Sequence, residues 1–236
     1  MIKNNTQTIF KFSRKYSFII PYQPQNNIAV ATVSGKSYFK FVDILRRLKL
    51  NYDSVLPEEI TSSDRRLILT TVHESSKIPT NLVLLDDEFN YHPTIIKAKI
   101  VEKLQSGLND SSLVIGIDPG SRIGLSVFYY EKEIESSFYT SIDDLVSHII
   151  KILVGINARR KVVKVGNGTM RIARHIVNSL NLRFCSHFEL EFVDERKTSL
   201  KIRNYNKRGE RDKISARCIT QREGYRYLIL PLSRMG

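Results

Sequence analysis

Acidic side chains end or open three of the segments that the sequence predicts to be regular structure. Asp118 ends the short run Leu-Val-Ile-Gly-Ile, which is typical of a strand buried on both faces. Asp194 and Glu195 end an alternating strand, and Asp212 opens a predicted helix. A carboxylate at the end of a buried strand needs a partner, a hydrogen-bond network or a metal ion. The three positions are therefore candidates for one acidic site.

Converging carboxylates of this kind suit the hydrolysis of a phosphodiester. That reaction needs a water deprotonated near neutral pH and a stabilised leaving alkoxide, and one or two Mg²⁺ or Mn²⁺ ions held by carboxylates achieve both. Hard oxygen ligands select such ions over zinc. The competing interpretations are an ordinary turn at Asp118-Pro119-Gly120 and a simple first-turn acid at Asp212. Strand alternation puts Asp194 and Glu195 on opposite faces and does not choose between them.

The elements that must position these acids belong to the second half of the chain. Asp118 is expected at the tip of a hairpin, because Pro119 and Gly120 favour a turn and an aromatic, β-branched strand follows. In the last helix Asp212, Ser215 and Ala216 share a face, and small residues there would let the helix lie close to the sheet. Strands are predicted at 113–117, 123–130, 133–140, 161–165 and 188–193, and helices at 141–157, 170–180 and 212–219.

The first part of the chain alternates strand and helix patterns. Strands are predicted at 28–33, 65–72 and 81–85, and helices at 38–50 and 93–108. That alternation favours a small α/β domain with a largely parallel sheet. Residues 107–112 have the composition of a linker, so the predicted domains are 1–110 and 111–236.

A second candidate for chemistry is Ser34-Gly35-Lys36-Ser37, which follows a strand and precedes a helix. This is the end of a phosphate-binding loop pattern, but the pattern needs a glycine where this chain has Val30. Without the glycine-rich cradle the backbone amides cannot wrap phosphates. We interpret Gly35 as a turn and Ser37 as a helix cap.

Charge points to a polyanionic partner. The 236 residues carry a formal net charge of +13. From Arg159 onward, 19 Lys and Arg outnumber 7 Asp and Glu by 12, so the excess is concentrated in the last third. Such a concentration favours nucleic acid over an acidic protein partner. No window resembles a membrane span or a secretory signal, and two cysteines are too few for a disulfide framework, so we expect a cytoplasmic protein with reduced thiols.

The order of these motifs resembles the ribonuclease H-like superfamily, and within it the RuvC-like nucleases, especially the YqgF (RuvX) branch. The resemblance covers about residues 113–224 and rests on Gly-Ile-Asp-Pro-Gly at 116–120, Val-Asp-Glu-Arg-Lys-Thr at 193–198, and Asp212 in the last helix. Two departures are a shorter loop before Asp212 and a first part of about 110 residues with no counterpart in the small bacterial proteins. The resemblance implies a mixed sheet flanked by helices, with a small α/β domain in front.

The resemblance also implies a Mg²⁺- or Mn²⁺-dependent endonuclease. Asp118, Glu195 and Asp212 would be catalytic and hold the metal, with Asp194 as a further candidate. The substrate would be a Holliday junction, another branched DNA or precursor ribosomal RNA, and a junction cutter would be a symmetric homodimer. The residues expected to contact nucleic acid, unless they are only a solvated loop and a plain strand-to-helix turn, are Arg196, Lys197, Arg203, Lys207, Arg208, Arg211, Gly166 and Gly168.

Two other classes compete with the nuclease. Actin-like ATPases and sugar kinases can carry a similar strand ending in Asp118, but they need a second ATP-binding domain with its own glycine-rich motif, and none follows residue 128. A non-catalytic nucleic-acid-binding scaffold would keep the fold and lose the chemistry. The complete set of acids favours the enzyme, and metal binding would discriminate the two.

Overall fold

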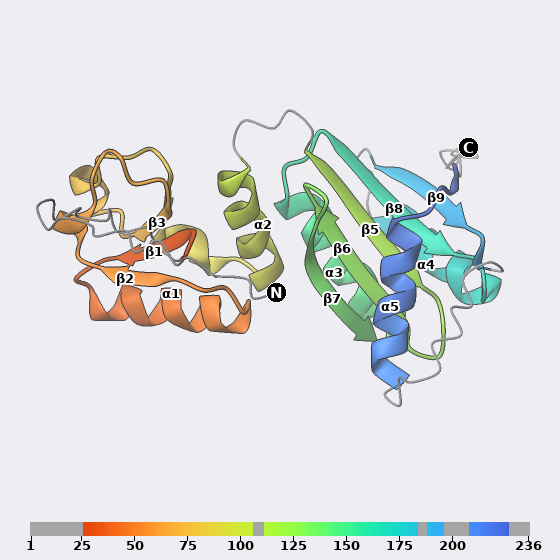
Figure 1. Cartoon of the computed structure of the whole chain (residues 1–236). Helices are drawn as coiled ribbons and strands as arrows, with labels where there is room; N and C mark the ends of the chain where they lie inside the picture. Colours follow the sequence, from red (N-terminus) through yellow and green to blue (C-terminus); the bar gives the residue numbers. More distant parts are fainter. Residues whose placement is uncertain (1–25, 106–110, 184–187, 196–207, 227–236) are drawn as a thin grey trace, which may run out of the picture.

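The structure, a computed structural model, describes residues 26–105, 111–183, 188–195 and 208–226. Within these residues the protein is an α/β protein with a four-stranded sheet, a six-stranded sheet and five α-helices (Figure 1). None of the helices in these ranges combines the length and apolar character that a membrane crossing requires.

The four-stranded sheet is entirely parallel, with the order β2-β1-β3-β4. One face packs against α1 and α2 through a core that includes Val30, Phe41 and Leu69. The predicted largely parallel sheet is confirmed. Its elements are β1 (Ile28–Ala31), α1 (Gly35–Arg47), β2 (Asp53–Val55), β3 (Leu67–Thr70), β4 (Val83–Leu85) and α2 (Pro93–Leu104), with short 3₁₀ turns at Pro57–Glu59, Ser75–Lys77 and Asp86–Asn90.

The start of α1 corrects one expectation. Ser34, not Ser37, caps the helix: its side chain accepts a hydrogen bond from the Ser37 backbone N–H, and Gly35 is the first helical residue. The reason is that a serine in extended conformation just before the first turn can reach an orphan amide of that turn, whereas Ser37 already lies inside the helix.

Helix α2 packs against both sheets (Figure 1). Ile96 and Ile100 belong to the core of the four-stranded sheet, while Ile95, Ala98 and Val101 belong to the core of the six-stranded sheet. A polar contact adds to this packing, since the Thr94 hydroxyl donates to the Glu135 carboxylate at 2.5 Å. The two sheets therefore share one helix within the described residues.

The six-stranded sheet is mixed and has the order β10-β9-β8-β5-β6-β7. Strands β5, β6 and β7 are antiparallel neighbours, β8 and β9 continue beside β5 in parallel, and β10 pairs antiparallel with β9. The elements are β5 (Ser112–Asp118), β6 (Ile123–Tyr129), β7 (Lys132–Tyr139), α3 (Ile142–Gly155), β8 (Arg160–Gly166), α4 (Met170–Arg183), β9 (Glu189–Val193), α5 (Arg208–Thr220) and β10 (Tyr225–Arg226).

The two faces of this sheet are covered by different helices. Leu113, Ile115 and Ile117 of β5 pack into the main core with residues of α3 and α4. The alternate residues of β5, which include Gly116 and Asp118, lie on the opposite face, and α5 crosses that face (Figure 1). The predicted burial of this strand on both faces is confirmed.

The last helix begins earlier than predicted. Helix α5 starts at Arg208, so Asp212 lies in its second turn and is not a first-turn acid. The sequence from Arg208 to Glu210 contains no proline, and Arg and Glu are good helix formers, so a single glycine does not stop the helix. Strands β2 and β10, which the sequence did not predict, are only three and two residues long.

Candidate functional site

The candidate site lies at one edge of the six-stranded sheet. Strands β9, β8 and β5 are parallel neighbours, so their carboxyl ends meet at the same edge. Asp118 is the last residue of β5, and Glu195 follows β9 by two residues. Gly166, the last residue of β8, lies between them in the sheet and pairs with Val193. The topology thus brings together two acids that are 77 positions apart in the sequence.

The register of the sheet indicates which of the paired acids faces α5. Val193 pairs with Gly166, and both lie on the α5 face. Glu195 is two residues beyond Val193, so strand alternation returns it to that face. Asp194 is one residue beyond Val193, so alternation directs it to the opposite face. The carboxylate of Glu195 indeed lies against Gly166 and contributes to the electrostatics of Asp118. Of the two acids that the sequence could not separate, Glu195 is the one beside Asp118.

Two glycines allow α5 to lie directly on the sheet. A Cβ atom at Gly116 would come within 2.4 Å of the Ala216 carbonyl oxygen, and one at Gly124 within 2.1 Å of the Asp212 carbonyl oxygen. Gly124 pairs across the sheet with Asp118, so α5 carries Asp212 over the residue next to Asp118. The helix backbone therefore fills the space that a side chain at either glycine would need.

Glu195 is held by the turn between β8 and α4. A Cβ atom would fall 1.8 Å from Glu195 Oε1 at Gly166 and 2.2 Å from Oε2 at Gly168, so only glycine leaves room for this carboxylate. The Glu195 backbone N–H donates to the Asn167 side chain at 3.1 Å. The sequence predicted that these glycines either contact nucleic acid or form a plain turn, and the structure places a carboxylate against both of them.

Asp118 has the perturbed electrostatics of a functional acid. Burial and, after it, the charges of Glu195 and Asp212 raise its pKa to about 7, while a hydrogen bond from Ser215 opposes the shift. The mutual repulsion shows that the three acids share one neighbourhood, one of them on each of β5, the end of β9 and α5. Perturbed pKa values of this size cluster at functional sites.

The three carboxylates suit a hard divalent cation, although their side chains are not arranged as a coordination sphere in this structure. Within the described residues, no three His, Cys, Asp or Glu side chains stand close enough together to hold one metal ion. Carboxylate oxygens are nevertheless the ligands that Mg²⁺ and Mn²⁺ prefer, and a cation would relieve the repulsion that raises the pKa of Asp118. Asp118, Glu195 and Asp212 are the residues that would hold it.

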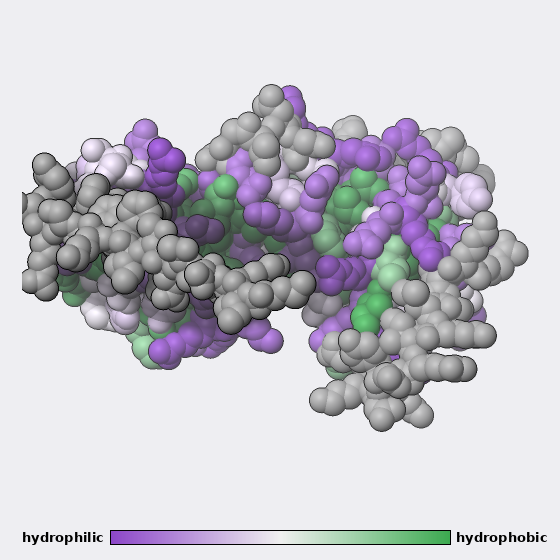
Figure 2. Space-filling view, viewed as in Figure 1, coloured by the Kyte–Doolittle hydropathy of each residue, from purple (hydrophilic) through white to green (hydrophobic). Residues whose placement is uncertain are grey.

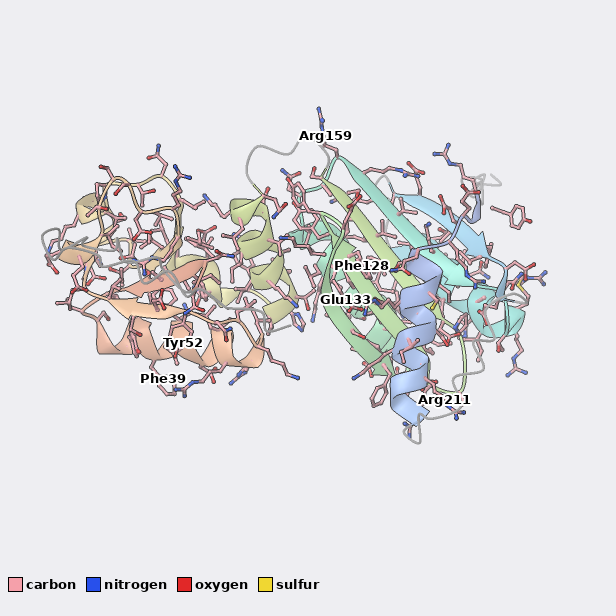
Figure 3. The ribbon with its side chains drawn as sticks, in the orientation of Figure 1. Phe39, Tyr52, Phe128, Glu133, Arg159 and Arg211 are labelled. Atoms are coloured by element: carbon pink, nitrogen blue, oxygen red, sulfur yellow. The ribbon has the colours of Figure 1, made fainter. Side chains whose placement is uncertain are left out.

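The basic residues predicted to contact nucleic acid are only partly described. Arg211 lies exposed near the beginning of α5 (Figure 3). Arg208 is the first residue of α5, and its side chain is outside the description. Figure 2 shows mainly hydrophilic residues around α5 on the viewed face, with small apolar areas between them. The predicted contacts Arg196, Lys197, Arg203 and Lys207 lie outside the described residues.

Sequence reasoning missed two interactions on the α5 face of the sheet. Ser215, considered only for its small size, donates a hydrogen bond to Asp118. Lys164 pairs with Gly116 on the α5 face, where its ammonium lies 3.5 Å from Glu191 and donates to the Arg222 carbonyl oxygen. The helical spacing of Ser215 with Asp212 was visible in the sequence, but the contact with Asp118 needs the register of the helix on the sheet.

Comparison with known proteins identifies no family. No protein-family model and no curated protein matches the chain. The structure of Argonaute from Aquifex aeolicus is similar over 72% of this chain and 36% of that chain, with 13% identity and a TM-score of 0.28. A crystal structure of Aa-Ago with externally bound siRNA covers 70% of this chain and 35% of that chain, with 10% identity and a TM-score of 0.25. The chain thus spans about a third of these Argonaute chains, and at these TM-scores the likeness defines neither family nor function.

Proposed function

We propose that the part of the chain from about residue 111 is a ribonuclease H-like nuclease of the RuvC or YqgF type, which hydrolyses phosphodiester bonds of structured nucleic acid with Mg²⁺ or Mn²⁺. The observation that carries the proposal is the convergence of Asp118, Glu195 and Asp212 from three separate elements on one face of the sheet, which together with burial raises the pKa of Asp118. Clustering three half-buried, mutually repelling carboxylates costs stability, and such clusters are typical of functional sites.

The arrangement of the sheet supports the same proposal. Three antiparallel strands are followed by two strands in parallel with the first, and the acids lie at the carboxyl edge of that parallel part. Helices connect β7 to β8 and β8 to β9, while α5 supplies the third acid from the opposite face. This is the mixed sheet flanked by helices that the sequence resemblance predicts.

The residues would divide the work as follows. Asp118, Glu195 and Asp212 would hold the metal, which when bound would supply charge to stabilise the leaving oxygen and to lower the pKa of a water. Ser215 fixes the orientation of Asp118 by its hydrogen bond. Gly166 and Gly168 leave room for the Glu195 carboxylate, because a side chain at either position would collide with it.

The same account proposes how the substrate is attracted. Arg211 is exposed near the beginning of α5, beside the acid site, where it would contact phosphates. The excess positive charge of the last third would attract a polyanion over a longer range. A junction substrate would require two sites and hence a homodimer, whereas a structured RNA would not.

A panel of end-labelled substrates tests the proposal. A four-way junction, a flap, a duplex and a structured RNA are incubated with the full chain in Mg²⁺ and in Mn²⁺, and a parallel reaction contains a chelator. We expect cleavage of at least one substrate in the metal reactions and none with the chelator. Asp118→Asn should abolish cleavage and retain binding. Full cleavage by Asp118→Asn would refute the role of the acids, and binding without cleavage by the wild type would favour the non-catalytic scaffold.

A further inference from the structure

An exposed aromatic residue lies two strands away from Asp118, in the same row of paired residues across the sheet. Gly124 of β6 pairs with Asp118 on one side and with Phe138 of β7 on the other. Residues directly opposite each other in a sheet point to the same face, so Phe138 lies on the α5 face with the acids. Adjacent strands are about 4.8 Å apart, so the row puts the backbone of Phe138 about 10 Å from that of Asp118.

Phe138 has the surroundings of a binding surface and not of a core. Its side chain is 43% exposed, whereas Ile123, which faces the main core on the opposite side of the sheet, is 3% exposed. The guanidinium of Arg122 lies over its ring, 5.4 Å from the centroid. Arg122 is itself exposed and comes from the turn that follows Asp118. An aromatic ring and an arginine therefore form a paired surface at the β7 side of the sheet, next to the acid site.

The chemistry of this pair selects one kind of occupant. An aromatic face binds any nucleobase by stacking, and an adjacent arginine adds a cation–π contact and attraction to phosphate. A base inside a continuous duplex keeps its face stacked on its neighbours, so only an unpaired or splayed base can use the surface. The net charge of +13 attracts a polyanion and would repel a basic partner.

We infer that Phe138 and Arg122 form a stacking platform for an unpaired nucleobase of the strand whose phosphate enters the acid site. The inference rests on the proposed nuclease function and narrows its substrate class to nucleic acid that is single-stranded or distorted beside the scissile bond. The row that joins Phe138, Gly124 and Asp118 sets the platform within a nucleotide or two of that bond.

The test measures binding without cleavage. Full-length protein in metal-free buffer is titrated into a labelled single-stranded oligonucleotide and into the matching duplex, and anisotropy gives both Kd values. Phe138→Leu should weaken single-strand binding by about tenfold, because base stacking on an aromatic residue is worth roughly that factor or more. Duplex binding should change less than twofold. Phe138→Tyr keeps the ring and should bind as the wild type does.

Two further variants provide a control and an independent test of the platform. Phe39→Leu removes an aromatic residue that is 73% exposed on α1, in the other part of the molecule (Figure 3), and should leave both Kd values unchanged. Arg122→Ala should weaken single-strand binding without removing the ring, so it tests the platform independently if Phe138→Leu fails to fold. A 2-aminopurine base in the strand should lose fluorescence on binding wild type and not on binding Phe138→Leu.

The possible outcomes separate this inference from the proposed function. Unchanged single-strand affinity in Phe138→Leu and Arg122→Ala, with metal-dependent cleavage intact, overturns the platform alone. Equal losses on single strand and duplex also overturn it, because they indicate a general phosphate contact. A wild-type protein that binds neither nucleic acid and cleaves nothing overturns both, and a protein partner would then be the occupant to seek.

Discussion

Replacing Asp118 by Asn should stabilise the metal-free protein at pH 7, although it removes the residue that we consider most important for catalysis. The pKa of the Asp118 carboxyl is raised from 3.8 to about 7, first by burial and then by Glu195 and Asp212. The folded protein therefore binds this proton more tightly than the unfolded chain does. The stability that the carboxyl contributes is complete below pH 3.8 and is lost as the pH rises to about 7.

The size of the effect follows from that window. At about 1.4 kcal/mol per pH unit, the interval from 3.8 to about 7 corresponds to an upper limit of about 4 kcal/mol at neutral pH. The Asn amide is also buried, although it can still accept a hydrogen bond from Ser215, so we expect about half of the limit to be recovered. A gain of ~2 kcal/mol would raise the Tm of a domain of this size by about 4–8 °C.

The assay is thermal unfolding of full-length wild type and Asp118→Asn at pH 7 and at pH 4.5, with and without Mn²⁺. At pH 4.5 most of the difference should disappear, because the wild-type carboxyl is then protonated when folded. Mn²⁺ should raise the Tm of the wild type and not of the variant, which also reduces the difference. Asp144→Asn, at an exposed first-turn acid of α3, is the control and should be slightly destabilising. A variant less stable than the wild type at pH 7, or an equal gain at both pH values, would refute the reasoning.

Two further predictions concern other residues of the described structure. Gly168→Ala should displace the Glu195 carboxylate, cost about 1–3 kcal/mol in chemical denaturation and weaken Mn²⁺ binding, because a Cβ would lie 2.2 Å from Oε2. Gly35→Ala, which meets open space, should change stability by less than about 1 kcal/mol. His92 caps α2 and contacts the His148 ring, and burial lowers its pKa, so its contribution to stability is present above pH 6.5 and is lost as the pH falls below it. His92→Asn keeps a capping side chain that does not titrate, and its Tm should fall less than that of the wild type between pH 7 and pH 5.

Much of the fold could be predicted because burial leaves a clear pattern in the sequence. The apolar run before Asp118 and the strand that ends at Gly166 were predicted within one or two residues. Asp53–Val55 was missed because it contains two polar residues and lies at the edge of its sheet, so it carries no apolar run. Short edge strands are held mainly by backbone hydrogen bonds, which every residue type except proline can both donate and accept.

The candidate site was predicted less completely, because its geometry depends on register. The sequence could identify Asp118 from the cost of an acid at the end of a buried strand. It could not choose Glu195 over Asp194, because that choice follows from the pairing of Gly166 with Val193. Nor could it show that Gly166 and Gly168 make room for a carboxylate, since that requires knowing which side chain lies over them.

The central claim is that Asp118, Glu195 and Asp212 hold one divalent metal site, and a Mn²⁺ titration followed by electron paramagnetic resonance tests it most directly. Free Mn²⁺ gives a sharp signal that is lost on binding, so the titration counts the ions bound per chain without any substrate. For the full-length wild type we predict one or two ions, as carboxylate sites of this kind hold. Asp118→Asn and Glu195→Gln should each lose this binding, while Asp144→Asn should retain it. Mn²⁺ binding that is identical in all four proteins, or absent from the wild type, would contradict the account.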